Sequence, residues 1–156
     1  MTEPTVRALA RADLPAIATI LDGVALFPKE MLDDLAAPYL GGREDHLWLV
    51  ATAGDAITGF AYCEAERATE GCHNLLAIAV AADRQREGHG GALLAALEAT
   101  LAAGGARVLI VETSALPGYA GARAFYPRQG FGEEARIRDF YADGDDKIVF
   151  WKRLKT

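Results

Sequence analysis

A glycine-rich turn directly after an apolar segment is the part of this chain best suited to hold a charged ligand. The apolar segment runs from 75 to 82, and the turn reads Gln85-Arg-Glu-Gly-His-Gly-Gly91, with an alanine- and leucine-rich helix beginning at about Gly90. Glycine lets backbone N–H groups approach a ligand closely, and a helix N-terminus adds partial positive charge. These features predict a phosphate-binding turn at the end of a buried strand.

The amino-acid sequence of this turn excludes two common phosphate-binding motifs. A nucleotide-triphosphatase loop ends in Gly-Lys-Ser/Thr, which does not occur in the chain. A dinucleotide-binding fingerprint needs a third small residue three places after its second glycine, and that position holds Leu93. What remains is Gln85-x-x-Gly88-x-Gly90. Taken alone, this pattern is equally compatible with an ordinary glycine-rich helix start.

A second segment, about thirty residues further on, carries a tyrosine in a distinctive setting. Ala122, Tyr126, Gly130 and Phe131 are spaced as Ala-x-x-x-Tyr-x-x-x-Gly-Phe. Together with the glycine-rich turn, this segment resembles the GCN5-related N-acetyltransferase (GNAT) superfamily. The resemblance extends over nearly the whole chain.

The resemblance implies acetyl-CoA as the donor, with no metal. The central strand would splay from the strand that begins near Arg107, and the pantetheine arm would lie in the gap like an added strand. A backbone N–H near Val80 would polarise the thioester carbonyl. The implied cofactor-binding residues are Ile78, Ala79, Val80, Gln85, Arg86, Glu87, Gly88, His89, Gly90, Gly91, Tyr119, Ala122 and Phe125.

The resemblance assigns Tyr126 as the general acid that serves the departing thiolate. A tyrosine has a reference pKa near 10 and a thiol near 8.5, so proton transfer is slightly uphill, although a positioned donor still stabilises the sulfur. The alternative is a packing role beside Phe125. Tyr119 stands where relatives often carry Asn, so this part of the cofactor site departs from the family pattern.

A general base is harder to assign, because the segment 75–82 lacks the glutamate that many relatives carry on the central strand. Deprotonating an ammonium of pKa near 10.4 at pH 7 costs about 4.6 kcal/mol, so a carboxylate, a histidine or a water chain should help. Glu112 is the leading candidate, because it ends the strand next to the predicted splay. Glu64, Glu66 and His73 border the loop before the central strand and are alternatives, and each can also be a simple solvated residue.

Two arginines near the C-terminus allow a further contact with the acceptor. Arg136 and Arg138 fall on one face of a predicted strand. They could pair with a substrate carboxylate or lie in solvent among the neighbouring aspartates. The acceptor pocket is expected between the loop 23–30 and the final hairpin, where the sequence does not identify the acceptor.

Hydrophobic periodicity and glycine positions predict a mixed sheet with helices on its faces. The resemblance implies an α/β (α+β) fold with a mostly antiparallel central sheet, splayed at a cofactor cleft and flanked by about four helices. The predicted helices are 14–21, 30–40, 90–103 and 121–128. The predicted strands are 5–9, 47–53, 57–63, 75–80, 107–112, 134–141 and 147–154.

Composition limits the broader classes of function. The chain of 156 residues is expected to form one domain over 1–156. A net charge of −6 without a Lys/Arg block argues against nucleic acid, and no apolar stretch or basic signal suggests a membrane or secretion, so a cytoplasmic location is expected. Cys63 and Cys72 are expected to be free thiols. A homodimer is the commonest default for a protein of this kind.

Two functions from different classes fit these observations. The first is an acetyl-CoA-dependent N-acetyltransferase, in which a primary amine of a small molecule or a protein attacks the thioester directly. The second is a non-catalytic acyl-CoA-binding module that acts as a sensor or partner subunit. The absence of a glutamate on the central strand favours the module, whereas Tyr126 favours the enzyme.

Overall fold

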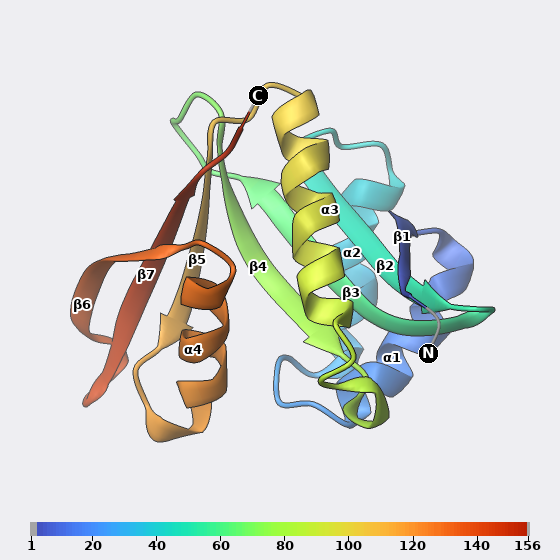
Figure 1. The fold of residues 1–156 in the computed structure, drawn as a ribbon, viewed down its shortest axis with the longest axis horizontal. Helices are drawn as coiled ribbons and strands as arrows, with labels where there is room; N and C mark the ends of the chain where they lie inside the picture. The colour runs from blue at the N-terminus through green and yellow to red at the C-terminus, as the bar shows by residue number, and fades with distance from the viewer. Residues whose placement is uncertain (1–2, 156) are drawn as a thin grey trace.

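The computed structural model describes residues 3–155, which form one sheet of seven strands and four α-helices (Figure 1). The element order and the mixed sheet confirm the predicted fold class. The strands are β1 (Thr5–Ala8), β2 (His46–Ala53), β3 (Ala56–Ala65), β4 (Cys72–Val80), β5 (Val108–Ser114), β6 (Gly132–Ala142) and β7 (Asp145–Arg153). The helices are α1 (Leu14–Asp22), α2 (Leu32–Leu40), α3 (His89–Ala103) and α4 (Ala120–Arg128). None of the helices in this part of the chain has the length and hydropathy needed to span a bilayer.

The strands of the sheet lie in the order β1-β2-β3-β4-β5-β7-β6. Only β4 and β5 run parallel among the described strands, and every other neighbouring pair is antiparallel. Parallel neighbours need a crossover connection, which α3 supplies. The C-terminal hairpin then inserts β7 between β5 and β6.

The two parallel strands pair over only part of their length. Residues 72–75 of β4 pair with residues 108–111 of β5, and the described pairing ends there, although β4 continues to Val80 and β5 to Ser114. Figure 1 shows the strands diverging into a V beside α4. The facing edges of both strands therefore carry backbone groups without a sheet partner.

A β-bulge lies at the apex of this V. Tyr62 opposes Ala77 and Cys63 opposes Leu75, so Leu76 is an extra residue on β4. A bulge bends its strand and increases the local twist. The bulge therefore directs the last residues of β4 away from β5 and leaves Leu76 46% exposed.

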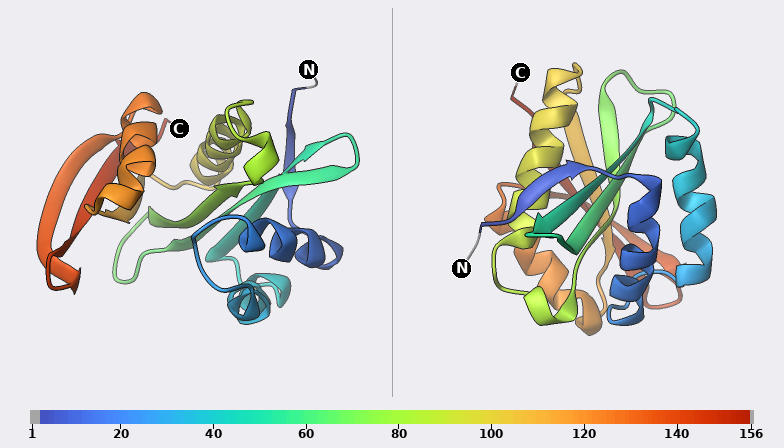
Figure 2. Two further views of the ribbon diagram at one scale, coloured as in Figure 1. Left: turned by 90° about the horizontal axis from the view of Figure 1, so that it is seen from below. Right: turned by 90° about the vertical axis from the view of Figure 1, so that its right-hand side faces the viewer.

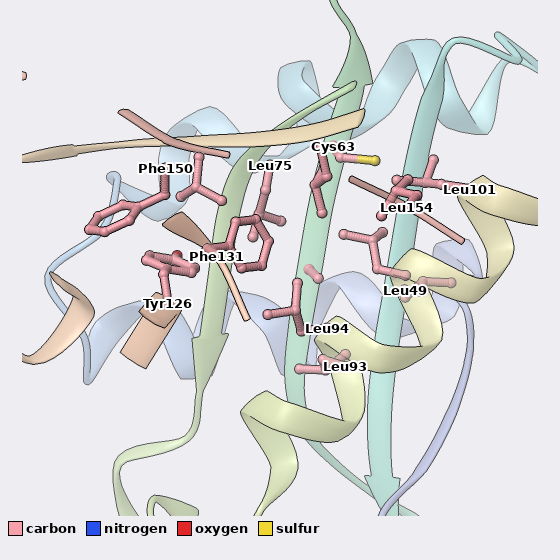
Figure 3. Close-up of a cluster of buried hydrophobic side chains, with 14 of the residues drawn as sticks. Leu49, Cys63, Leu75, Leu93, Leu94, Leu101, Tyr126, Phe131, Phe150 and Leu154 are labelled. Atoms are coloured by element: carbon pink, nitrogen blue, oxygen red, sulfur yellow. The ribbon is translucent and has the colours of Figure 1, made fainter. Parts of the chain in front are cut away.

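Helices cover both faces of the sheet (Figure 2), and a hydrophobic cluster lies on each face. On one face α1 and α2 pack on the aromatic side chains of β2 and β3, where Trp48 stacks on Tyr62 with ring centres 4.3 Å apart. On the other face α3 and α4 cover the sheet, and Figure 3 shows Tyr126, Phe131 and Phe150 gathered next to Leu75. This aromatic cluster fixes α4 against the open side of the V.

The main departure from the predicted strands is in β6. Its pairing with β7 is interrupted between Ile137 and Ala142, and Asp139 adopts a φ of 54°. The backbone N–H of Asp139 donates to the carboxylate of Asp146 at 2.9 Å, and the Asp139 carboxylate accepts the N–H of Gly144 at 2.8 Å. We call residues 138–141 the β6 excursion.

The core on the α3 face gives a test of the fold. Leu97 is completely buried, so Leu97→Ala should lower the free energy of unfolding by about 2–5 kcal/mol through lost burial and the cavity left behind. Thr100→Ala on the exposed side of the same helix should change it by no more than about 0.5 kcal/mol. Urea denaturation measures both values, and equal effects would contradict the packing described.

Candidate active site

A cleft of about 610 Å³ lies at the open end of the V. Its walls come from the end of β4, the glycine-rich turn, the side of α4 and the loop after α1. The cleft brings together nearly all the predicted cofactor-binding residues, which are far apart in the sequence. Those that line it are Ile78, Ala79, Val80, Gln85, Arg86, Gly88, His89, Gly90, Gly91, Ala122 and Phe125.

Two predicted cofactor-binding residues do not line the cleft. Glu87 lies with a carboxylate oxygen 3.7 Å from Nε2 of His89 and 4.0 Å from Nη1 of Arg84. Tyr119 is 45% exposed in the 3-10 turn Pro117–Tyr119 that precedes α4. The connection from β5 to α4 is instead held by Arg123, whose Nη1 donates to the carbonyls of Ser114 (2.7 Å) and Leu116 (2.8 Å).

The loop after α1, which was expected to line the acceptor pocket, supplies residues 24–26 to the cleft. The sequence did not identify two arginines, Arg84 and Arg128, which join the predicted Arg86 in the wall. Guanidinium groups bind phosphate oxygens well, so these arginines suit a ligand with several phosphates. The available signal was the pair of basic residues flanking Gln85 and the arginine two places after Tyr126.

The backbone of the glycine-rich turn is shaped to expose N–H groups. Gly88 has a φ of 86° and Arg86 a φ of 69°, and α3 begins at the next residue, His89. The first helical turn closes with a bond from Ala92 N to Gly88 O at 3.0 Å, and the amides before Ala92 have no partner within the helix. The start of a helix of 15 residues therefore presents free donors and partial positive charge to the cleft.

Two side chains anchor this turn. Nδ1 of His89 lies 2.6 Å from Oγ1 of Thr58, whose hydroxyl can donate to the carbonyl of Ala51 at 3.3 Å. That arrangement makes Nδ1 the donor, and His89, only 1% exposed, can contact a ligand through its backbone amide rather than its ring. Gln85 donates from Nε2 to Val80 O at 3.3 Å, which ties the turn to the end of β4.

Tyr126 combines a packing role with a position in the cleft. Its ring makes contacts with Phe125, Phe131 and Phe150 at centroid distances of 5.3, 5.7 and 5.5 Å. Its hydroxyl makes no hydrogen bond with any residue of the described range, and Tyr126 lines the cleft. Burial raises the pKa of Tyr126 to about 12. The hydroxyl therefore stays protonated at physiological pH and is available as a donor to a ligand.

Glu112 lies on the other side of the sheet. Side chains alternate along β5, so that Val111 faces the α3 and α4 core while Glu112 faces the opposite side. Glu112 follows directly on the last paired residue of β5, at the apex of the V. Its two oxygens accept hydrogen bonds from Asn74 Nδ2 (3.1 Å) and Lys147 Nζ (2.7 Å). It does not line the cleft.

The alternative bases lie further from the splay. Glu64 accepts a hydrogen bond from the Tyr62 hydroxyl, and Glu66 is an exposed residue 3.3 Å from Nδ2 of Asn74. His73 lies in the paired part of β4, where burial lowers its pKa. Of the four candidates, Glu112 is therefore the one at the apex of the V, where β4 and β5 begin to diverge.

The two cysteines do not form a reactive centre. Cys63 and Cys72 are free thiols, and burial raises the pKa of Cys63 to about 12. A thiol of that kind is almost entirely un-ionised at neutral pH and is a poor nucleophile. Within residues 3–155 no group of three or more His, Cys, Asp or Glu is arranged to hold a metal ion.

Comparison with known proteins establishes the family. Residues 44–133 match the model of the acetyltransferase (GNAT) domain. A crystal structure from Desulfovibrio desulfuricans assigned to the GNAT family is 31% identical, with a TM-score of 0.91 and coverage of 98% of this chain and 100% of that one. This chain therefore belongs to the GNAT acetyltransferase family. No curated protein matches it in sequence.

Two other solved structures also resemble this chain. The ribosomal-protein-S18-alanine N-acetyltransferase of Escherichia coli is 27% identical, with a TM-score of 0.80 and coverage of 99% of this chain and 96% of that one. A Salmonella typhimurium structure with acetyl-CoA as its cofactor is 20% identical, with a TM-score of 0.76 and coverage of 97% and 94%.

A pair of glycine substitutions tests the glycine-rich turn. Gly88→Ala should strain the left-handed backbone by about 1–2 kcal/mol and weaken CoA binding roughly tenfold. Gly144 has a similar φ of 80° in the β6–β7 turn, so Gly144→Ala should strain the chain equally and leave CoA affinity unchanged. Calorimetric titration with CoA and thermal denaturation separate the two effects. Equal loss of CoA affinity in both variants would rule out a specific role for the turn.

Proposed function

We propose that this protein transfers the acetyl group of acetyl-CoA to a primary amine by direct attack on the thioester. The observation that carries the proposal is a single cleft containing the glycine-rich turn, the unpaired edge of β4 and Tyr126. The turn and its arginines suit the phosphates of the cofactor, and the strand edge suits the pantetheine amides. Tyr126 supplies a donor for the leaving sulfur.

We propose the following reaction on the basis of these positions. The amine nitrogen attacks the thioester carbon, and an N–H on the edge of β4 near Val80 stabilises the negative charge on the carbonyl oxygen. As the carbon–sulfur bond breaks, Tyr126 donates a hydrogen bond to the sulfur. The proton lost by the amine passes to Glu112, directly or through a water molecule, because a carboxylate oxygen keeps a second lone pair for it.

The raised pKa of Tyr126 defines how it helps. With a pKa of about 12 for the phenol and about 8.5 for a thiol, complete proton transfer is uphill by about 5 kcal/mol. A hydrogen bond to the developing thiolate avoids this cost of proton transfer, and it strengthens as negative charge accumulates on the sulfur. Tyr126 therefore stabilises the leaving group mainly as a fixed hydrogen-bond donor.

The setting of Glu112 favours an acceptor that loses its proton easily. Both carboxylate oxygens are already hydrogen-bonded. At pH 7 an α-amine of pKa about 8 needs about 1.4 kcal/mol for deprotonation, against about 4.6 kcal/mol for a lysine amine. The E. coli relative acts on an alanine of a ribosomal protein. We therefore propose a polypeptide N-terminus as the acceptor.

The decisive assay measures CoA release with acetyl-CoA and a short peptide that begins with a free alanine, followed by a panel of small primary amines. Amine-dependent release and a mass increase of one acetyl group support the enzyme. Binding of acetyl-CoA without release in the presence of any amine would instead indicate an acyl-CoA-binding module.

Tyr126→Phe should reduce kcat by roughly 10²-fold or more, because the hydrogen bond to the sulfur is lost. CoA affinity and melting temperature should change little, since the hydroxyl has no partner in the described chain. For the wild type, a Tyr126 pKa of about 12 predicts no loss of activity from its ionisation up to about pH 11. Tyr39→Phe is the matched control, because its hydroxyl bonds Leu9 O at 2.9 Å far from the cleft. An unchanged kcat for Tyr126→Phe would remove it from the mechanism.

Glu112→Gln should lower kcat/KM for the alanine peptide by roughly 10²-fold at pH 7. The deficit should shrink above about pH 8, where most of the α-amine is already neutral. Glu66→Gln alters the other carboxylate next to Asn74 and should have little effect. A deficit that is the same at every pH would mean that Glu112 has a structural role instead.

A further inference from the structure

We infer that Lys147 is a specificity-determining residue that selects against acceptors arriving as ammonium ions. Its own ammonium occupies the position beside Glu112 that such an acceptor would need. The inference rests on the proposed acetylation of amines. Lys147 lies on β7 opposite Ser114, at the end of β5 that has left the parallel pairing.

The contacts of Lys147 are those of a bound cation. Its Nζ is 2.7 Å from Glu112 Oε2 and 3.6 Å from the centre of the Phe140 ring. A carboxylate and an aromatic face are the two groups that hold an ammonium ion most effectively. The side chain of Lys147 is only 9% exposed. The chain therefore carries an ammonium site that its own lysine fills.

The β6 excursion builds the aromatic half of this site. It places Phe140 over Nζ of Lys147, although Phe140 itself is 51% exposed. The neighbouring Tyr141 has its pKa raised by burial and by the carboxylates of Glu112 and Asp145. Glu112 thus belongs to an acidic neighbourhood that would attract cations.

Among the described residues, Lys147 is the only cation that forms a salt bridge with Glu112. Two nearby charged groups have other partners: Asp145 accepts a hydrogen bond from Ser114, and Nε of Arg136 lies 2.7 Å from Asp146. Asn74, which is 5% exposed, bridges Glu66 and Glu112 through its neutral amide. The charge that an incoming acceptor meets at Glu112 is therefore that of Lys147.

A tethered cation discriminates between acceptors by their protonation. An acceptor ammonium must displace Lys147 or approach a like charge, which is a repulsive element of the kind that creates specificity. A neutral amine meets no such opposition. At pH 7 about a tenth of an α-amine of pKa near 8 is neutral, against about 0.04% of a lysine amine. Lys147 should therefore favour N-terminal amines over lysine-type amines.

The experiment compares two peptides of the same sequence at saturating acetyl-CoA. One has a free N-terminal alanine and no lysine, and the other is N-terminally acetylated and contains one lysine. In the wild type kcat/KM should favour the α-amine. Lys147→Met keeps the stem under Phe140 and removes the charge. It should raise kcat/KM for the lysine peptide and reduce the preference at least about tenfold.

Two variants serve as controls. Lys147→Arg keeps the positive charge and should keep the wild-type preference. Lys152→Met removes a lysine from the same strand that is equally well paired, with Nζ 2.7 Å from Glu98 on the opposite face, and should also keep it. Melting temperature and CoA affinity of all variants establish that they fold.

The outcomes distinguish this inference from the proposed function. If Lys147→Met lowers kcat/KM equally for both peptides, Lys147 merely holds Glu112 in place and the inference is wrong. An unchanged preference is equally incompatible with it. If no variant releases CoA with either peptide or with the amine panel, the proposed function fails and this inference fails with it. Activity on the lysine peptide that appears only in Lys147→Met would support both.

Discussion

The early end of pairing between β4 and β5 is the constraint on which the rest of the structure depends. A sheet normally satisfies the backbone groups of its interior strands, and leaving them unpaired inside a protein is unfavourable. Here the parallel ladder stops after Leu75 and Val111, where the bulge at Leu76 turns β4 aside. The V can remain open because the aromatic cluster of Tyr126, Phe131 and Phe150 packs α4 against the sheet beside it. The exposed strand edge is then free for a ligand that bonds like a strand.

The same constraint separates the two chemical roles across the sheet. Successive residues of β5 point to opposite faces, so Val111 packs in the core that holds Tyr126 while Glu112 faces the side of α1 and α2. In the proposed mechanism, the donor for the leaving group and the acceptor for the amine proton therefore lie on opposite faces of the sheet. The hydrogen bond between His89 and Thr58 joins α3 to β3. It holds the turn that precedes α3 in place next to the end of β4.

The sequence was sufficient for the elements that have strong local signals. Residues 75–80 are apolar on both faces and are followed by glycines, which predicts a buried strand and a helix start, and both are present. The segment around Tyr126 predicts a short helix, observed as α4. These signals depend on periodicity and turn chemistry, which act over a few residues and are therefore readable without knowledge of the fold.

Features that depend on strand register or on side-chain direction could not be read in this way. Lys147 and Glu112 are 35 residues apart, and only the pairing of β5 with β7 brings them together. The β6 excursion depends on Asp139 adopting a positive φ within a run that otherwise has the composition of a strand. His89 was predicted to bind cofactor from its place in the turn and it lines the cleft, but the sequence did not indicate that its ring contacts Thr58.

Basic and acidic side chains lie in different parts of the site. Arg84 and Arg86 from the turn before α3 and Arg128 from α4 line the cleft, whereas Glu66 and Glu112 do not line it and share a contact with Asn74. In the proposed mechanism, the arginines would attract the polyanionic donor and the carboxylates would attract a cationic amine. An acidic protein of net charge −6 would, however, attract amines without selection. In the proposed mechanism, Lys147 against Glu112 would convert that general attraction into a requirement for a neutral nucleophile, which is the form of the amine that reacts.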